Sequence, residues 1–260
     1  MTRRFAELRA PQVDEVVSER SILIQPFGAV EQHGPHLPFN TDLVVAEAVS
    51  SAVVEEFGDE LDLFMLEPFA YTKSNEHAWS PGSIWMNPTT LLAMIDDLAR
   101  SVAPLPSRKI VFINGHGGNS SLLSVALREV RLHHGLMTFL MHPSVPPDQG
   151  GPSTEEEHGM GIHGGLSETS MMLHLRPDLV DMGVATRNVP AALVANDKVK
   201  FGGSVPFGWL SNDFGPDGHI GDPTGATAER GERQFNAAVA NLGASLREVA
   251  AFEYPMEGGG

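Results

Sequence analysis

Residues 31–38, EQHGPHLP, place a carboxylate and two imidazoles, those of Glu31, His33 and His36, on a segment that suits neither a helix nor a strand. Two prolines in the segment lack a backbone N–H donor, and its glycine adds conformational freedom that the chain must lose on folding. The sequence therefore predicts a constrained loop that carries ionisable side chains.

Further acidic and histidine side chains occupy similar positions elsewhere in the chain. Asp42 precedes an expected helix, His116 lies in the motif NGHGGN, and His163 and Glu168 flank the start of a later helix. Carboxylates and imidazoles without thiols are the ligands of hydrolytic zinc, manganese or iron sites, and one carboxylate can bridge two ions. Together these residues predict a metal site.

Each residue also has a structural alternative. Asp42 is a candidate helix N-cap, Glu168 would be favourable in a first helical turn in any case, and His116 would serve to hydrogen-bond a turn. His219 is a weak candidate for lining a pocket. Four histidines are interpreted as ordinary surface or packing residues: His133, His134, His142 and His174.

Apolar strands alternate with amphipathic segments along the chain. Strands are expected at 21–30, 61–69, 109–114 and 136–141, with a short candidate at 83–86. Helices are expected at 42–57 (ending at Gly58), 87–103 (Asn87 as N-cap, Pro88 first), 119–134, 167–175 and within 221–252. The remaining long segments, 70–83, 143–166 and 185–222, are expected to be loops or irregular.

This alternation predicts an α/β fold. We expect a single three-layer domain over residues 1–260, with a mostly parallel central sheet flanked by helices and a flexible tail at 254–260. Ligands of open parallel sheets bind beyond the carboxyl ends of the strands. Because EQHGPH and GHGGN both follow expected strands, we expect them to be neighbours in space.

Composition narrows the classes of partner. The 260 residues carry a formal net charge of −16, which disfavours nucleic acid and anionic membrane as partners. The absence of cysteine excludes disulfides and thiolate metal sites, and suits a cytoplasmic protein. No apolar run approaches the length of a membrane span, and residues 1–12 are not those of a secretory signal.

Five stretches resemble the creatininase (creatinine amidohydrolase) family. They are FGAVEQHGPHLPFNTD (27–42), EHAWSPGSIWM (76–86), INGHGGN (113–119), HGGLSETSMML (163–173) and IGDPTGATAERGE (220–232). The resemblance implies an α/β fold, two divalent metal ions, and water-driven hydrolysis of a non-peptide C–N bond. Zinc is the first expectation for the metal, with manganese or iron as alternatives. The resemblance also implies a homo-oligomer, with a hexamer as the expected form.

The resemblance also implies roles for single residues. Glu31 and His116 would bind one metal, His33 the other, and Asp42 would bridge the two. Creatininase takes a further glutamate at the position of Gly118, where this chain departs from the pattern; many relatives use the glutamate of the ETS segment, here Glu168.

His163 of the segment His163-Gly164-Gly165 would be the catalytic proton-transfer residue. Four more residues are expected to contact substrate or to orient a ligand: His36, Glu76, His77 and Trp79. His77 is expected beside Asp42 or the substrate. Trp79, Trp85 and Trp209 are candidate apolar walls or core residues, and FGGSVPFGW (201–209) is a candidate lid or subunit contact.

The first expected activity is hydrolysis of a small cyclic amide or formamide, with a metal-bridging water as the nucleophile. The chain has no clear match to the paired tryptophans that enclose creatinine in creatininase, so creatinine itself is not the expected substrate. Alternatives are a peptidase trimming a ribosomally made cofactor-precursor peptide of the mycofactocin type, a hydrolase of a cyclic inositol-derived ketone, and a non-catalytic metal-binding homologue. A metallophosphatase is disfavoured because no Arg or Lys stands beside the motifs.

Overall fold

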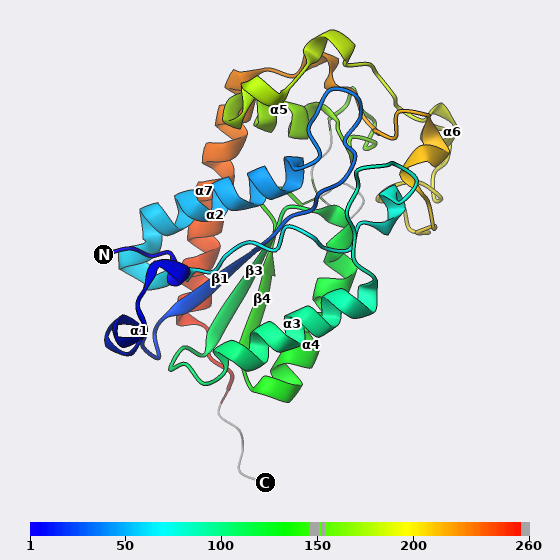
Figure 1. Cartoon of the computed structure of the whole chain (residues 1–260). Coiled ribbons are helices and arrows are strands. Elements are labelled where there is room, and N and C mark those ends of the chain that lie inside the picture. Colours follow the sequence, from blue (N-terminus) through cyan, green and yellow to red (C-terminus); the bar gives the residue numbers. More distant parts are fainter. Residues whose placement is uncertain (146–150, 152–153, 256–260) are drawn as a thin grey trace.

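A four-stranded parallel sheet forms the centre of the molecule (Figure 1). The computed structural model describes residues 1–145, 151 and 154–255. The strand order is β2-β1-β3-β4, and the strands are β1 (Ile22–Phe27), β2 (Leu63–Met65), β3 (Lys109–Asn114) and β4 (Met137–Met141). Part of the predicted loop 143–166 and most of the predicted tail 254–260 lie outside the described residues.

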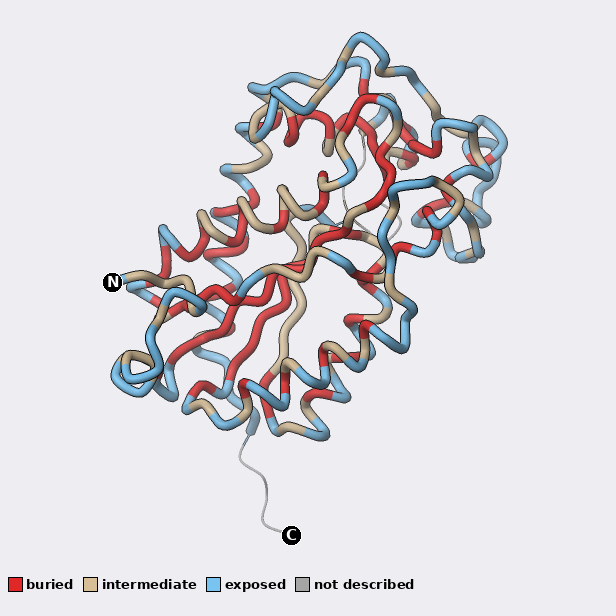
Figure 2. The backbone as a smooth tube through the Cα atoms, viewed as in Figure 1, coloured by how far each residue is buried: buried red, intermediate tan, exposed pale blue. Residues whose placement is uncertain are grey.

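The two central strands are buried along their whole length (Figure 2). Their sequences, ILIQPF and KIVFIN, are nearly continuous apolar runs, as expected for strands covered by helices on both faces. Ile22 of β1 is in register with Leu63 of β2 and with Lys109 of β3. The strands therefore begin level with one another, and their carboxyl ends lie at one edge of the sheet.

Helices cover both faces of the sheet (Figure 1). One face packs against α2 (Thr41–Leu61) and α7 (Ala228–Ala251). The other face packs against α3 (Pro88–Val102) and α4 (Ser120–His134), with the short α1 (Ala10–Val16) at its margin. The predicted three-layer α/β fold is confirmed.

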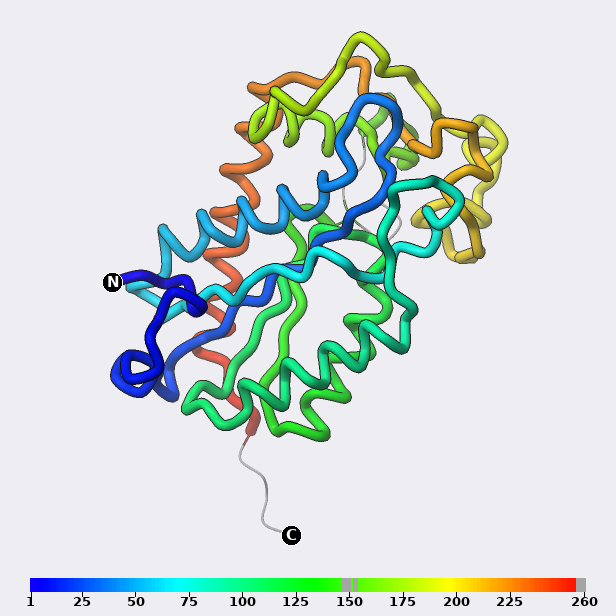
Figure 3. The backbone as a smooth tube through the Cα atoms, viewed as in Figure 1, coloured from blue at the N-terminus to red at the C-terminus, as the bar shows by residue number. Residues whose placement is uncertain are grey.

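A smaller lobe lies beyond the carboxyl ends of the strands. It contains α5 (Leu166–Leu175), the one-turn α6 (Ala191–Val194) and irregular segments that follow each of them. Met160, Leu193, Phe201 and Ile220 form its own small apolar core. Figure 3 shows the loop after β1, the loop 66–87 and the segment 185–222 gathered at this end of the molecule.

Most predicted elements are present, and two details of the prediction are wrong. Gly58 does not end its helix, because Leu61 beyond it is buried in the core; Asp62, with φ 55°, ends α2 instead. Residues 83–86 form an isolated bridge between Ile84 and Val30 rather than a strand. As expected, Asn87 is the N-cap residue and Pro88 opens α3, although the Asn87 side chain makes no capping hydrogen bond.

Among the described residues, none of the helices is both long and apolar enough to span a membrane.

Candidate metal centre

Five predicted ligands converge at the carboxyl edge of the sheet. Glu31 and His33 lie on the loop after β1, Asp42 in the first turn of α2, His116 just after β3, and Glu168 in the first turn of α5. All are buried except Glu168, which is partly buried. Their potential ligand atoms fall into two groups, each with all atoms within 4.8 Å of one another: Glu31, Asp42 and His116; and His33, Asp42 and Glu168.

Asp42 belongs to both groups. Its Oδ1 lies 3.0 Å from His33 Nε2, and its Oδ2 lies 3.1 Å from His116 Nδ1. The two oxygens thus face different imidazoles, as the oxygens of a carboxylate between two cations would. The alternative role of Asp42 as a helix N-cap is wrong, because Asn40 occupies that position and Asp42 lies inside α2.

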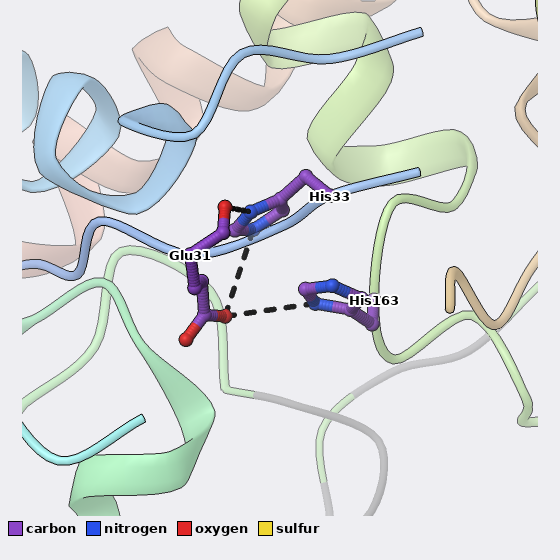
Figure 4. A group of neighbouring side chains, drawn as sticks. All are labelled: Glu31, His33 and His163. Carbon is purple, nitrogen blue, oxygen red and sulfur yellow. Dashed lines mark hydrogen bonds and ion pairs between the residues drawn. The ribbon is translucent and has the colours of Figure 1, made fainter. Parts of the chain in front are cut away.

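Glu31 Oε1 is surrounded by imidazole nitrogens. His116 Nδ1 lies at 3.2 Å, His77 Nε2 at 3.4 Å, His163 Nδ1 at 3.7 Å and His33 Nε2 at 3.9 Å. Figure 4 shows the Glu31 carboxylate directed between the rings of His33 and His163, which form a third group of potential ligands with it. The other oxygen, Oε2, accepts a hydrogen bond from Ser74.

Two of these buried oxygens accept no hydrogen bond. Within the described residues, neither Glu31 Oε1 nor Asp42 Oδ2 has a hydrogen-bond partner. A buried polar atom without a partner is costly, and a divalent cation would satisfy both oxygens. The donor set of carboxylates and imidazoles therefore fits a metal centre on the chain's own geometry.

Backbone carbonyls fix the tautomers of three histidines. His33 Nδ1 donates to the Glu31 carbonyl at 3.0 Å, and His116 Nε2 donates to the Lys73 carbonyl at 2.8 Å. His163 Nε2 donates to the Gln32 carbonyl at 2.6 Å. In each ring the other nitrogen is thereby left to face the carboxylates, which is the usual arrangement of metal-binding histidines.

Electrostatics divide the ionisable groups into two sets. Burial opposes a charge on His33 and His116, but the carboxylates of Asp42 and Glu31 outweigh it: the pKa of His33 rises to about 10 and that of His116 rises well above its usual value. Burial alone would raise the pKa of Asp42, yet His33 and His116 hold it far below its usual value. Burial raises the pKa of Glu168 to about 7. The carboxylates around the His33 and His116 rings therefore favour positive charge at the place where the proposed ions would lie.

His163 and His77 belong to the other set. Burial and the neighbouring His33 lower the pKa of His163 well below its usual value. Burial, then His33, His116 and Lys73, lower the pKa of His77 to about 2. Both rings are therefore neutral near pH 7. His163 presents a lone pair at Nδ1, because its Nε2 carries the proton.

Three more of the predicted site residues are His36, His77 and Trp79. His36 Nε2 lies 3.0 Å from Thr169 Oγ1, next to Glu168, and burial lowers its pKa to about 4. His77 contacts Glu31, where Asp42 or the substrate was expected. Trp79 donates to Ser211 Oγ at 2.6 Å, lies against Gly218 and is not among the described residues that line the cavity, so its contact with substrate stays a prediction.

A cavity of about 430 Å³ opens above the metal centre. Four of the five proposed ligands form its floor: Glu31, Asp42, His116 and Glu168. Its apolar wall is formed by Pro88, Leu122, Ile162, Phe207 and Trp209. Of the three tryptophans, Trp209 alone is among the described lining residues. Phe207 and Trp209 thus place the end of FGGSVPFGW at the cavity, while Phe201 packs in the small core of the lobe.

Sequence reasoning missed Lys73 and Ser74. Lys73 lines the cavity, and its Nζ donates to Glu76 Oε2 at 2.6 Å. The argument against a phosphatase, that no Arg or Lys stands near the motifs, therefore does not hold for the folded chain. The sequence contained a signal: Lys73 lies in the predicted loop 70–83, close to Glu76 and His77, which were expected to contact substrate or orient a ligand.

The departure at Gly118 has a geometric reason. A Cβ built on Gly118 would lie 2.0 Å from Glu76 Oε1 and 2.4 Å from His116 Nε2. The glycine therefore leaves room for the Glu76 carboxylate. Glu76 lies on the Nε2 side of His116, away from the Nδ1 that faces Glu31 and Asp42. Glu168 is the further carboxylate that groups with His33 and Asp42.

Comparison with known proteins identifies similar chains. The family model described as creatinine amidohydrolase matches residues 6–246. The mycofactocin precursor peptide peptidase of Mycolicibacterium smegmatis is 36% identical over 218 residues, covering 82% of this chain and 79% of that protein. The creatinine amidohydrolase of Pseudomonas putida is 32% identical over 196 residues, covering 68% and 72% of the two chains.

Solved structures share the fold. A putative creatinine amidohydrolase from Bacteroides fragilis superimposes with a TM-score of 0.78 at 24% identity, covering 98% of this chain and all of that one. A mutant creatininase described as Zn-Zn type has a TM-score of 0.74 at 26% identity, covering 96% and 98% of the two chains.

Proposed function

The chain belongs to the creatininase family, and from this membership and the geometry of its metal centre we propose that it is a two-metal hydrolase that cleaves an amide C–N bond. The observation that carries the proposal is the position of Asp42, whose two oxygens face His33 and His116 separately. Glu31 and His116 would hold one ion with Asp42, and His33 and Glu168 would hold the other. The inclusion of Glu168 in this set counts against a non-catalytic homologue.

The main contribution expected from the metal ions is positive charge next to the reacting groups. When bound, two divalent ions, zinc by first expectation, would lower the pKa of a water molecule towards neutrality and polarise the substrate carbonyl. The similarity to a creatininase of the Zn-Zn type supports this choice of metal. Burial of the floor residues excludes bulk water, which strengthens every charge interaction in the site.

His163 is the residue that we assign to proton transfer. Its neutral ring directs Nδ1 towards Glu31 Oε1, and the Gln32 carbonyl holds the proton on Nε2. Nδ1 can therefore accept a proton from the attacking water and return it to the leaving nitrogen when the C–N bond breaks. The same hydrogen bond keeps the ring from turning between these two steps.

Two substrate classes are supported by different relatives. The sequence alone placed a small cyclic amide first and a peptide second. The 36% identity to a peptide peptidase over 82% of the chain reverses that order in our proposal. A small cyclic amide is the second candidate, supported by the 32% identity to a creatinine amidohydrolase over 68% of the chain. A cavity of about 430 Å³ holds the end of a peptide or a small ring.

The oligomeric state, the partners and the location of the protein stay predictions from the sequence. We propose a homo-oligomer that acts on a free small molecule or peptide in the cytoplasm, without nucleic-acid or membrane partners.

Replacement of Asp42 tests the proposal. In Asp42→Asn, one amide nitrogen would face a cation, so we expect fewer than two zinc ions per chain. We also expect a fall of at least about 100-fold in hydrolysis of peptide amides and lactams. Metal is measured by elemental analysis and activity by amine release. Asp59→Asn, at a fully exposed carboxylate on the far turn of α2, is the matched control. An Asp42→Asn protein that keeps two ions and its activity would refute the bridging role.

A further inference from the structure

The charged residues that line the cavity are unequal in number. Among the described lining residues are four carboxylates, those of Glu31, Asp42, Glu76 and Glu168, and one lysine, Lys73. Three of the carboxylates belong to the proposed ligand set, and the pair of Lys73 and Glu76 does not. The pair lies in the cavity wall, where a substrate group beyond the scissile bond would lie.

The backbone of Lys73 is fixed on both sides. Its N–H donates to Asn119 Oδ1 at 3.2 Å, and its carbonyl accepts the hydrogen bond from His116 Nε2 at 2.8 Å. Lys73 is therefore tied directly to a residue of the metal centre. Any group that its side chain binds is held in a constant position relative to that centre.

Glu76 positions the side chain of Lys73. Glu76 Oε2 accepts from Lys73 Nζ at 2.6 Å, while Oε1 lies 3.6 Å from His116 Nε2 in the space left by Gly118. An ammonium group has three donors, and the described residues provide this one side-chain acceptor. The Lys73 side chain is 23% exposed, so its further donors can reach a ligand in the cavity.

The charge of the loaded cavity favours an anion. Two divalent ions and Lys73 bring five positive charges against the four carboxylates of the lining. A cationic substrate group would be repelled, and Glu76 is already paired with Lys73. A carboxylate can accept from Nζ alongside or in place of Glu76.

Accordingly, we propose that Lys73 binds a free carboxylate of the substrate on the leaving-group side of the scissile amide. This inference rests on the proposed function and makes it more specific. Leu122, Phe207 and Trp209 form an apolar wall of the same cavity, so the leaving part is an apolar amino acid or short peptide with a free C-terminus. Hydrolysis adds the water oxygen to the carbonyl carbon, breaks the C–N bond and protonates the nitrogen. The products are an acid and an amine that keeps its own carboxylate.

The test compares two probes that differ only in the terminal group. 3-Phenylpropanoic acid and 3-phenylpropanamide, which lack the N-acyl amino acid bond of a substrate, are titrated calorimetrically into the zinc-loaded protein. We expect the acid to bind about tenfold more tightly than the amide, as befits one charged hydrogen bond. In Lys73→Met this affinity ratio falls towards one, whereas Lys73→Arg keeps most of it. Lys198→Met, at an exposed lysine outside the cavity lining, makes the same charge change and keeps the full ratio.

Two results would overturn the inference. One is a wild-type protein that binds both probes equally well. The other is a Lys73→Met protein with normal zinc content that still prefers the acid, because the metal ions would then bind the carboxylate.

If Lys73→Met does not fold, Glu76→Gln decides the question. The substitution keeps an oxygen that can accept from Lys73 Nζ but removes the competing negative charge, so we expect the ratio to rise, and an unchanged or lower ratio contradicts the role of Lys73. The inference and the proposed function fail separately. A protein that prefers the acid probe but cleaves no amide refutes the function, whereas one that cleaves both free-acid and amidated peptides equally refutes the role of Lys73.

Discussion

At the scale of single residues, the two buried acids of the proposed ligand set, Glu31 and Asp42, have histidines as neighbours rather than arginines or lysines. Glu31 and Asp42 both contact His116, and both lie within 3.9 Å of His33. An arginine would neutralise these acids permanently, because it does not lose its proton. An imidazole can neutralise an acid when it is protonated, and it can offer a lone pair to a metal when it has lost that proton. The same histidines can therefore accompany the acids with or without metal ions.

Gly118 provides a test at this scale. In Gly118→Ala the new Cβ would collide with Glu76 Oε1 and with the His116 ring. We expect the overpacked variant to lose about 1–3 kcal/mol of unfolding free energy and part of its zinc affinity. Urea denaturation and zinc titration measure the two effects.

Gly225→Ala is the control for this substitution, because its Cβ would meet only Leu166 Cδ1 at an ordinary 3.7 Å. If Gly118→Ala behaves like this control, then Glu76 does not depend on the space above Gly118.

At the scale of elements, α5 must be held in place for Glu168 and His163 to reach the site. Glu157 does much of this. Its buried carboxylate accepts from the backbone N–H of Leu166 at 2.9 Å, from that of Asp222 at 2.8 Å, and from Thr154 Oγ1 at 3.0 Å. A negative charge at the first turn of α5 is favourable in its own right. One side chain therefore joins three segments around the start of this helix.

Removal of the Glu157 carboxylate is expected to loosen α5. Glu157→Ala leaves the buried N–H of Leu166 and the partly buried N–H of Asp222 without this acceptor, which costs about 2 kcal/mol or more of unfolding free energy. Glu157→Gln keeps one oxygen for both N–H groups and should recover most of the loss. Chemical denaturation measures stability, and zinc affinity reports on Glu168. The exposed Glu156→Gln is the neighbouring control. A Glu157→Ala protein with full stability and zinc affinity would contradict this positioning role.

The elements could be predicted from the sequence where local pattern and burial agree. The run KIVFIN is a strand by pattern and by burial, and β3 has the predicted bounds. The predicted helix end at Gly58 and the predicted strand at 83–86 are wrong because contacts with the rest of the fold determine the structure there. These contacts are the packing of Leu61 in the core and the bridge from Ile84 to Val30.

The proximity of the segments EQHGPH and GHGGN could be predicted from the strand ends that they follow, whereas the ligand roles of Asp42 and Glu168 came from the family resemblance. The position of Trp79 could not be predicted, because it depends on Ser211, a hydrogen-bond partner 132 residues away. Lys73 was missed for the same reason, since its place beside His116 depends on a contact across the fold.

At the scale of the whole molecule, the metal centre joins the sheet to the smaller lobe. Glu31, His33 and His116 follow strands, Asp42 starts a helix of the sheet layers, and Glu168 starts a helix of the lobe. Bound ions would therefore link the two parts, and their binding energy would add to the stability of the folded chain.

Metal removal tests this link. After chelation we expect a lower melting temperature, and zinc at about 100 times its dissociation constant should restore about 2.7 kcal/mol, or roughly 5–10 °C. Differential scanning calorimetry measures the shift. Magnesium, which prefers oxygen ligands, should restore much less than zinc. Equal melting temperatures with and without zinc would show that zinc does not bind the folded chain, and would contradict the proposed centre.

The order of the ligands along the chain has a consequence for how the centre comes into being. Glu31 and Glu168 are separated by 136 intervening residues, and β3, which precedes His116, must be inserted beside β1 before the first group of ligands is complete. During synthesis, which proceeds from the N-terminus, a ribosome-bound chain would have the acids and imidazoles of the first loop long before their partners emerge. The second group is complete only when α5 has folded onto the finished sheet. Uptake of a second ion would thus wait until α5 has folded, and a chain that held both ions would have its sheet and its smaller lobe correctly folded.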